Sequence, residues 1–162
     1  MEPEHFVFAL VEDFTHMALT CAVDPLRIAN MISGQTLYRW SYASEDGATA
    51  RASDQSVLHV HHAFSDVPPC DRLFALSGIH MQHKDTTRLI NAVRRVDRTR
   101  STRIGALCSG AWVLADAGLL DGQAAAIHWE YHDSFMEAFP EVALVRNVFV
   151  ADGPYITASG GT

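Results

Sequence analysis

Three short apolar runs along the chain predict the strands of a buried sheet. Residues 6–11, 72–76 and 103–107 are too short for ordinary helices, and they are rich in side chains that favour strands. A polar or glycine-containing turn follows each run. Continuous apolar strands are typical of parallel sheets, in which helices cover both faces.

Between and after these runs, apolar side chains recur at the spacing of helices. The predicted helices run from a cap at Thr15 to about residue 33, from a cap at Asp85 past Val96, over residues 111–117 with a stop at Gly118, and over residues 134–139. Pro25 lies within the first of them, so this helix either kinks there or a second segment begins. In the second helix, apolar residues share one face and arginines the other.

The remaining predicted strands are shorter and lie mostly in the second half of the chain. They occupy residues 37–44, 56–62, 124–127, 142–145, 148–151 and 155–158. Strands and helices therefore alternate along most of the sequence. This order predicts an α/β fold, a three-layer sandwich in which a mostly parallel sheet carries helices on both faces. The length of 162 residues and the hydrophobic content of 48% suffice for a single domain with one core.

The charge of the chain limits its partners. It carries 12 basic and 19 acidic side chains, a formal net charge of −7, which disfavours contact with nucleic-acid phosphates. The arginines between residues 88 and 103 are therefore interpreted as a solvated helix face and the loop after it. The three cysteines lack the spacing of a disulfide framework or a zinc site. Because the amino terminus is acidic and no apolar run has the length of a membrane span, we expect a soluble cytoplasmic domain.

Cys108 is placed like a nucleophile, because it follows a predicted strand and precedes a predicted helix. Such an elbow holds its residue in strained geometry at the carboxyl edge of the sheet. The amino terminus of the following helix is expected to lower the pKa of the thiol. The backbone amides of Ser109 and Gly78 are then placed to hold an oxyanion. The alternative is that Cys108 is one more small, buried, apolar residue.

Histidines supply the candidate bases and metal ligands. His128 follows a predicted strand, so it returns to the sheet edge of Cys108 and is a candidate base for the thiol. His59, His61 and His62 have metal-like spacing, but in one alternating strand only His59 and His61 share a face. We therefore expect no metal ion and no cofactor.

Several motifs together resemble one family of regulators. They are THMAL at 15–19, AVDPLRIAN at 22–30, LYRW at 37–40, LCSGAW at 107–112, AGLLDG at 117–122, IHWE at 127–130 and ASGGT at 158–162. Over nearly its whole length the chain is similar to the amino-terminal domain of GlxA-type transcriptional regulators of the AraC/XylS class. The resemblance implies the flavodoxin-like fold of PfpI and of class I glutamine amidotransferases. In such regulators a carboxy-terminal pair of helix-turn-helix motifs follows and binds DNA.

Two departures from the catalytic relatives of that fold concern the elbow. Ala18 aligns with a helix glutamate that commonly hydrogen-bonds the elbow cysteine, and Ala106 stands where an amidotransferase elbow has glycine. We therefore expect His128 to lie near Cys108 without forming a productive triad. The family pattern continues beyond Thr162 into a last helix and then the DNA-binding part, so we expect this sequence to be a fragment.

The sequence favours a domain that senses a small effector and controls an attached DNA-binding domain. The candidate ligand-binding residues are Gly78, Cys108, Ser109, His128, Trp129 and Glu130, and Cys108 and His128 are vestigial catalytic candidates. The motif at 127–130 resembles that of family members linked to the catabolism of quaternary amines such as glycine betaine or carnitine. The expected effector is therefore a quaternary amine, with an amino-acid derivative as the other class. An aromatic face beside a carboxylate suits such a cation. A homodimer without membrane contact is expected. The alternatives are an active cysteine hydrolase or amidotransferase-like enzyme and a dimerisation module with a dead pocket.

Overall fold

Seven strands form the main sheet of the computed structural model, which describes residues 1–160 apart from the side chain of Asp152. In sheet order they are β10 (Phe149–Asp152), β11 (Tyr155–Ala158), β7 (Arg103–Leu107), β6 (Arg72–Leu76), β1 (Glu4–Leu10), β2 (Tyr38–Ser44) and β5 (His62–Ala63). Neighbouring strands are parallel except β10 and β11. The predicted mostly parallel sheet is confirmed. Gly161 and Thr162 of the terminal motif lie outside the described residues.

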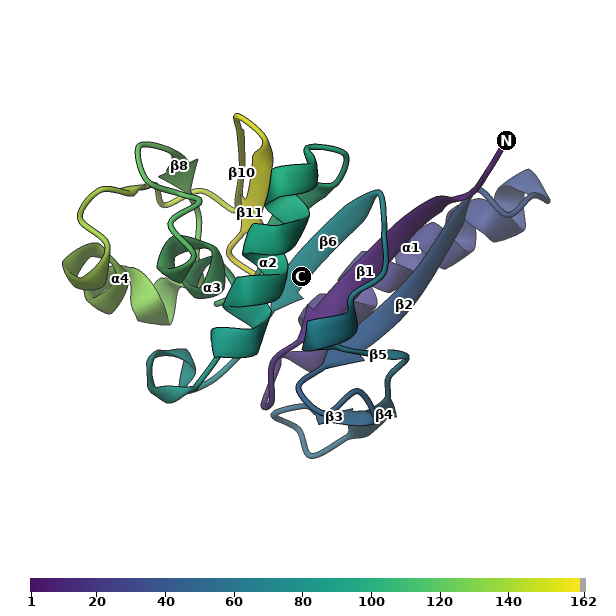
Figure 1. The fold of residues 1–162 in the computed structure, drawn as a ribbon, viewed down its shortest axis with the longest axis horizontal. Helices are drawn as coiled ribbons and strands as arrows, with labels where there is room; N and C mark the ends of the chain where they lie inside the picture. The colour runs from purple at the N-terminus through teal and green to yellow at the C-terminus, as the bar shows by residue number, and fades with distance from the viewer. Residues whose placement is uncertain (161–162) are drawn as a thin grey trace.

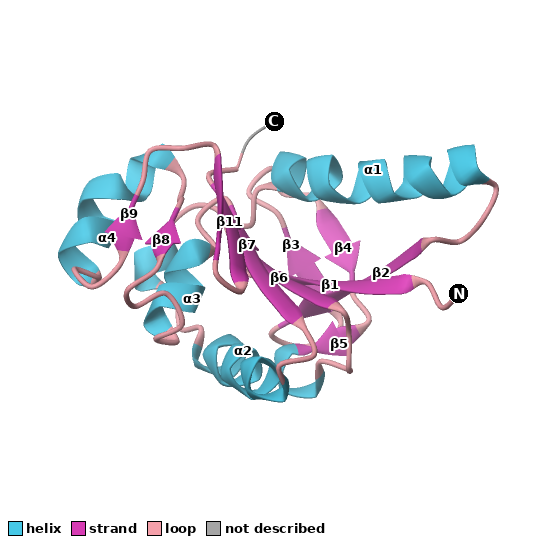
Figure 2. Cartoon of the chain, turned by 90° about the horizontal axis from the view of Figure 1, so that it is seen from above, coloured by secondary structure: helices cyan, strands magenta, loops and turns pink. Residues whose placement is uncertain are grey.

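Helices cover both faces of this sheet, as Figures 1 and 2 show. On one face lies α1 (His16–Ser33), and on the other lie α2 (Thr87–Thr99) and α3 (Ala111–Asp116). Next to α3, α4 (His132–Ala138) is held through aromatic rings: Trp112 of α3 meets Phe135 of α4 with ring centroids 6.0 Å apart. Three short 3₁₀ turns are η1 (Phe64–Asp66), η2 (Met81–His83) and η3 (Trp129–Tyr131). The three-layer sandwich is therefore confirmed.

The two faces of β1 explain the two layers of the core. Val7 and Ala9 belong to the buried cluster that includes the inward faces of α2 and α3, whereas Phe8 and Leu10 belong to the cluster under α1. All four side chains are at most 1% exposed. Burying an aliphatic or aromatic side chain of this size contributes roughly 1.5–3 kcal/mol, so the continuous apolar run fixes a central strand covered on both sides.

The segment predicted as one strand over residues 56–62 is in fact two strands. β4 (Val57–His59) pairs antiparallel with β3 (Thr49–Arg51), which the sequence did not predict, and β5 joins the edge of β2. The division falls at His61, whose backbone N–H donates to the carbonyl of Tyr42 and whose Nδ1 accepts from the Tyr42 N–H. These two bonds turn the chain from the hairpin onto the main sheet.

Other differences concern the ends of elements. α1 runs unbroken through Pro25, which excludes the second segment, one of the two alternatives that the sequence left open. The cap of α2 is Thr86 rather than Asp85, although Oδ1 of Asp85 accepts from the N–H of Thr87. β8 (Ala124–Ala125) and β9 (Ala143–Leu144) form a separate two-stranded sheet. None of the helices in the described part of the chain combines the length and the apolar character that crossing a bilayer requires.

Backbone strain gathers at the carboxyl ends of the three central strands. Asp13 after β1, His80 after β6 and Cys108 after β7 all have positive φ, at 64°, 59° and 59°. A non-glycine residue in this conformation costs roughly 1–2 kcal/mol, and such strain is concentrated at functional sites. The carboxyl edge of a parallel sheet is also where ligands bind in this class of fold.

Candidate functional site

Cys108 lies on the sharp turn that the sequence predicts between β7 and α3. Two glycines make room for this turn. A Cβ on Gly110 would lie 2.1 Å from the carbonyl oxygen of Ala75, and a Cβ on Gly160 would lie 2.6 Å from Cα of Cys108. Together with the positive φ of Cys108, these close approaches show a strained elbow.

Burial decides the chemistry of the Cys108 thiol. The residue is 4% exposed, and its Sγ lies 3.3 Å from Oγ1 of Thr15. Burial raises the pKa of the thiol, and it outweighs the hydrogen bonds from Thr15 and from the Ser109 amide, which lower the pKa. The negative charge of Glu130 raises the pKa further. The Ser109 amide thus acts in the direction that the sequence predicts, but the net shift of the thiol pKa is upward, opposite to the expected lowering.

Thr15 occupies the capping position that the sequence predicts, but its side chain does not cap α1. Its hydroxyl instead contacts the Cys108 thiol, 93 residues away in the sequence. A threonine that contacts a buried thiol contributes a weak hydrogen bond and no base.

His128 is close to the elbow but does not activate the thiol. Its backbone N–H donates to the carbonyl of Cys108 over 3.0 Å. Its Nδ1 accepts from the Glu130 N–H at 3.3 Å, so the neutral imidazole carries its proton on Nε2. Among the described residues, no hydrogen bond joins this imidazole to the thiol, and Ala18 beside Cys108 supplies no carboxylate. The described part of the chain thus lacks a nucleophile–base pair at the elbow.

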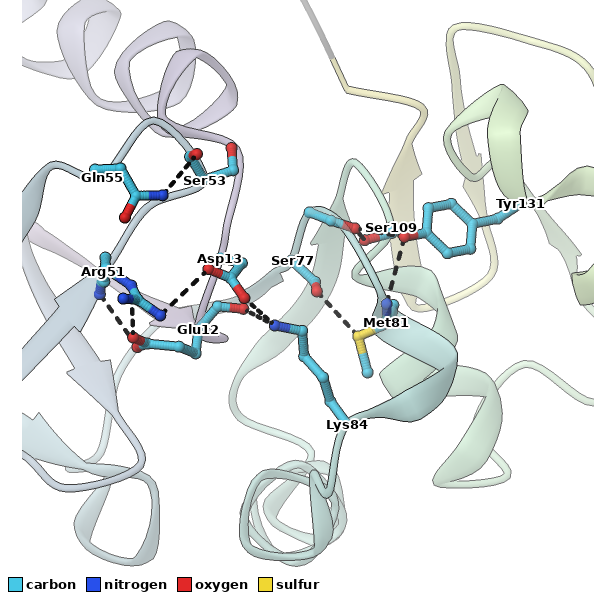
Figure 3. Close-up of polar contacts among 11 residues, drawn as sticks. Glu12, Asp13, Arg51, Ser53, Gln55, Ser77, Met81, Lys84, Ser109 and Tyr131 are labelled. Atoms are coloured by element: carbon cyan, nitrogen blue, oxygen red, sulfur yellow. Dashed lines mark hydrogen bonds and ion pairs between the residues drawn. The ribbon is translucent and has the colours of Figure 1, made fainter.

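The carbonyl of Gly78 ties three segments together. It accepts from Oγ of Ser109 at 2.7 Å and from the Tyr131 hydroxyl at 2.8 Å. The Tyr131 hydroxyl in turn accepts from the Met81 N–H, as Figure 3 shows. A Cβ on Gly78 would lie 2.3 Å from the carbonyl oxygen of Asp13, so only glycine fits against the β1–α1 loop. The elbow, the loop after β6 and η3 therefore form one hydrogen-bonded unit.

Ion pairs hold the other side of the β1–α1 loop (Figure 3). Nζ of Lys84 pairs with Oδ2 of Asp13 at 2.9 Å and donates to the carbonyl of Glu12. Arg51 pairs with the Glu12 carboxylate at 3.4 Å. The hydrogen bond from Lys84 holds the pKa of Asp13 below its usual value. These contacts fix the η2–α2 loop and β3 against the end of β1.

An open cavity of about 390 Å³ lies beside the elbow. The side chains that give it its character are His128, Trp129, His132, Arg146, Asn147 and Val148. Gly160 lines the cavity too, and it also packs against Cys108. Trp129 is 70% exposed and is therefore not a core residue.

The candidate residues from the sequence divide into two groups. His128 and Trp129 line the cavity, and the exposed Glu130 follows them in the chain. Gly78, Cys108 and Ser109 are buried and are not among its described lining residues. The structure therefore places the elbow behind the cavity wall rather than in it.

The clustered histidines have separate partners. Nε2 of His62 lies 3.2 Å from Oγ of Ser41, His61 binds Tyr42, and His59 belongs to the β3–β4 hairpin. The expected shared face of His59 and His61 is wrong, because the predicted strand is divided. In residues 1–160, no three histidine, cysteine or acidic side chains are grouped so that they could hold a metal ion.

The sequence matches the model of the DJ-1/PfpI family over residues 6–162. The chain belongs to the DJ-1/PfpI family. It is 38% identical over 160 residues to the HTH-type transcriptional regulator GbdR of Pseudomonas aeruginosa. The aligned residues make up 99% of this chain and 43% of that regulator. It is 36% identical over 155 residues to the HTH-type transcriptional regulator GlxA of Rhizobium meliloti, with 95% and 48% covered. The fold is similar to the crystal structure of an AraC family transcriptional regulator from Pseudomonas putida, with a TM-score of 0.83, 23% identity, and 98% and 84% of the two chains covered.

These findings confirm the resemblance to GlxA-type regulators and the flavodoxin-like fold of this DJ-1/PfpI domain. The chain spans less than half the length of the two curated regulators. Within the DJ-1/PfpI domain, three site residues escaped the sequence analysis: Thr15, Tyr131 and Arg146. Tyr131 directly follows the IHWE motif, which was a usable signal. No local pattern marks Arg146, because the cavity brings it beside His128 only in the folded chain.

Proposed function

We propose that this DJ-1/PfpI domain senses a small metabolite for a transcription regulator. The ligand occupies the cavity lined by His128 and Trp129, which Glu130 directly follows in the chain. Gly78, Cys108 and Ser109 support the cavity wall through the hydrogen bonds of the elbow. DNA binding through a separate helix-turn-helix part belongs to the same proposal and is supported by the HTH-type regulators among the relatives. Assembly as a homodimer is a further part of the proposal.

The observation that carries the proposal is an open cavity beside a thiol without a base. A cysteine nucleophile needs a low pKa or an adjacent base. Burial raises the pKa of Cys108, and His128 Nδ1 is occupied by the Glu130 amide. Binding without turnover is the chemistry left to such a site, and this is what a sensor requires.

The effector class follows from the exposed face of Trp129. An indole ring is the strongest partner for a cation among aromatic side chains, and a nearby carboxylate adds charge attraction. Trp129 supplies the exposed indole in the cavity lining, and Glu130, the next residue, supplies an exposed carboxylate outside the described lining. A quaternary amine or an amino-acid derivative is therefore the proposed class.

Thermal-shift titration of the 162-residue chain tests this function. The panel is glycine betaine, carnitine, choline and amino acids at fixed salt, with a DNA titration alongside. A saturable rise in Tm is expected for at least one compound, because a ligand that binds only the folded state stabilises it. Trp129→Ala is expected to reduce that rise, whereas Met31→Ala, a truncation of an exposed side chain on α1, is expected to preserve it. Absence of any shift, together with Cys108-dependent hydrolysis of amide or ester substrates, would favour the enzyme alternative.

A further inference from the structure

The cavity beside η3 differs in charge from the chain as a whole. The chain carries a formal net charge of −7, yet the described lining of the cavity contains Arg146, His128 and His132 and no aspartate or glutamate. Arg146 is exposed and forms no ion pair with any residue that the structure describes. Arg27 and Arg88, by contrast, pair with acidic side chains at 2.8 Å and 3.2 Å. Among residues 1–160, the guanidinium donors of Arg146 therefore have no acidic partner, and we treat them as the donors offered to a ligand.

His128 adds a further hydrogen-bond donor to the cavity. Because Nδ1 of His128 accepts from the Glu130 amide, its Nε2 carries the proton and can donate. Nε2 of His132 is 3.1 Å from the carbonyl of Ile127, so its proton is already used. A planar guanidinium accompanied by a further N–H matches an acceptor with two oxygens, such as a carboxylate.

The same cavity has an apolar side. Trp129 and Val148 line it while remaining 70% and 69% exposed. Large apolar side chains this exposed and this close to a cationic group indicate a ligand with two unlike ends. The volume of about 390 Å³ limits that ligand to a small metabolite.

We propose that the cavity binds a small monocarboxylate, whose carboxylate pairs with Arg146 and whose apolar or N-methylated body covers Trp129. The inference rests on the proposed sensing function and adds to it the chemical class of the ligand and its anchor. Arg146 then determines specificity, because a cation without a carboxylate leaves the guanidinium without a partner.

Calorimetric titration of the chain with matched probes tests this assignment. Glycine betaine, carnitine and 3,3-dimethylbutyrate carry the carboxylate, choline lacks it, and inorganic phosphate tests the other common anion. At least one carboxylate is expected to bind about tenfold more tightly than choline or phosphate. Arg146→Gln is expected to weaken that binding about tenfold or more. Arg146→Lys is expected to bind more tightly than Arg146→Gln but less tightly than the unmodified chain, because lysine keeps the charge and lacks the planar guanidinium. Arg98→Gln removes an exposed arginine of α2 outside the cavity and is the matched control.

The possible results distinguish the role of Arg146 and the ligand class from the sensing function itself. A carboxylate whose affinity changes less than about twofold in Arg146→Gln overturns the role of Arg146 and leaves sensing intact. Choline or phosphate binding as tightly as the carboxylates overturns the ligand class. No binding of any of the three carboxylates to the unmodified chain overturns the ligand class, and the sensing function is then decided by the thermal-shift panel alone. Unchanged circular dichroism of the variants shows that lost binding is not lost folding.

Discussion

At Cys108, the burial of the side chain outweighs the favourable position of the residue before a helix. Native alkylation measures this balance, because the thiolate is the reactive form. Cys21 is exposed, whereas Cys108 is buried with a raised pKa. With iodoacetamide near neutral pH, Cys21 is expected to react roughly tenfold faster than Cys108 or more.

Peptide mass spectrometry of the labelled chain resolves the two cysteines. Cys70, which burial gives a pKa of about 11, is the internal control for a slow thiol. Labelling of Cys108 ahead of Cys21 would show an activated thiolate and would support the enzyme alternative.

The residues of the site were predictable only where neighbours in sequence are also neighbours in space. Cys108 was found because a strand, a tight turn and a helix are consecutive. The Tyr131 hydroxyl meets the Gly78 carbonyl across 53 residues, and Thr15 meets Cys108 across 93 residues. Such contacts depend on the packing of the whole sheet, which no local pattern encodes.

At the scale of elements, Tyr131 joins η3 to the loop after β6. Tyr131→Phe keeps the ring, which meets Trp112 with centroids 6.3 Å apart, and removes the hydroxyl from Gly78 and Met81. The change leaves the buried Met81 N–H without its partner and removes one of the two hydrogen bonds to the Gly78 carbonyl, which is expected to lower the free energy of unfolding by about 1–2 kcal/mol. Urea unfolding measures the loss. Tyr38→Phe, whose hydroxyl has no hydrogen-bond partner in the described range, is the control, and an equal loss in both variants would contradict the bridging role.

The edge of the sheet formed by β1, β2 and β5 carries a pH-dependent contact. Oγ of Ser41 lies 3.0 Å from Nε2 of His5 and 3.2 Å from Nε2 of His62. Burial lowers the pKa of both histidines below 6.5, and the charge of Arg39 lowers that of His5 further, while Asp71 opposes the shift. The unfolded chain therefore binds more protons than the folded chain as the pH falls through 6.5.

The contribution of the two histidines to the free energy of unfolding is therefore expected to be fully present above this pH and to decrease as the pH falls toward about 5.5. Urea unfolding at several pH values measures the trend, and His62→Gln is expected to flatten it. A free energy of unfolding that rises on acidification across this range would contradict the assignment.

The elements themselves were predicted well where one pattern dominated. The apolar runs of β1, β6 and β7 lie at the centre of the sheet, as expected for strands buried on both faces. The prediction of one strand over residues 56–62 was wrong, because the alternation of apolar and polar residues does not show that His61 turns the chain onto β2. Short edge strands take their pairing from partners distant in sequence, so local alternation alone cannot place them.

For the whole molecule, the hydrogen-bonded unit around Gly78 connects η3, which lines the cavity, to the loop after β6 and to the elbow after β7. Trp129 lines the cavity, and Tyr131 in the same turn binds the Gly78 loop, which also receives Ser109 from the elbow. Under the proposed function, a ligand that contacts η3 would touch a unit hydrogen-bonded to the segments that follow β6 and β7. In a longer protein, such a connected unit can bias how an attached domain is presented.

The most direct test of the account is where a ligand binds. In ¹⁵N-labelled chain titrated with glycine betaine and carnitine, backbone resonances of residues 128–130 and 146–148 are expected to shift saturably, without loss of the ligand and without a covalent adduct at Cys108. Resonances of Arg100, Arg103 and Gly153, around the separate cavity at the opposite end of β7, are expected to stay in place. Shifts confined to that second cavity, or turnover of the ligand at Cys108, would contradict a sensing site beside the elbow.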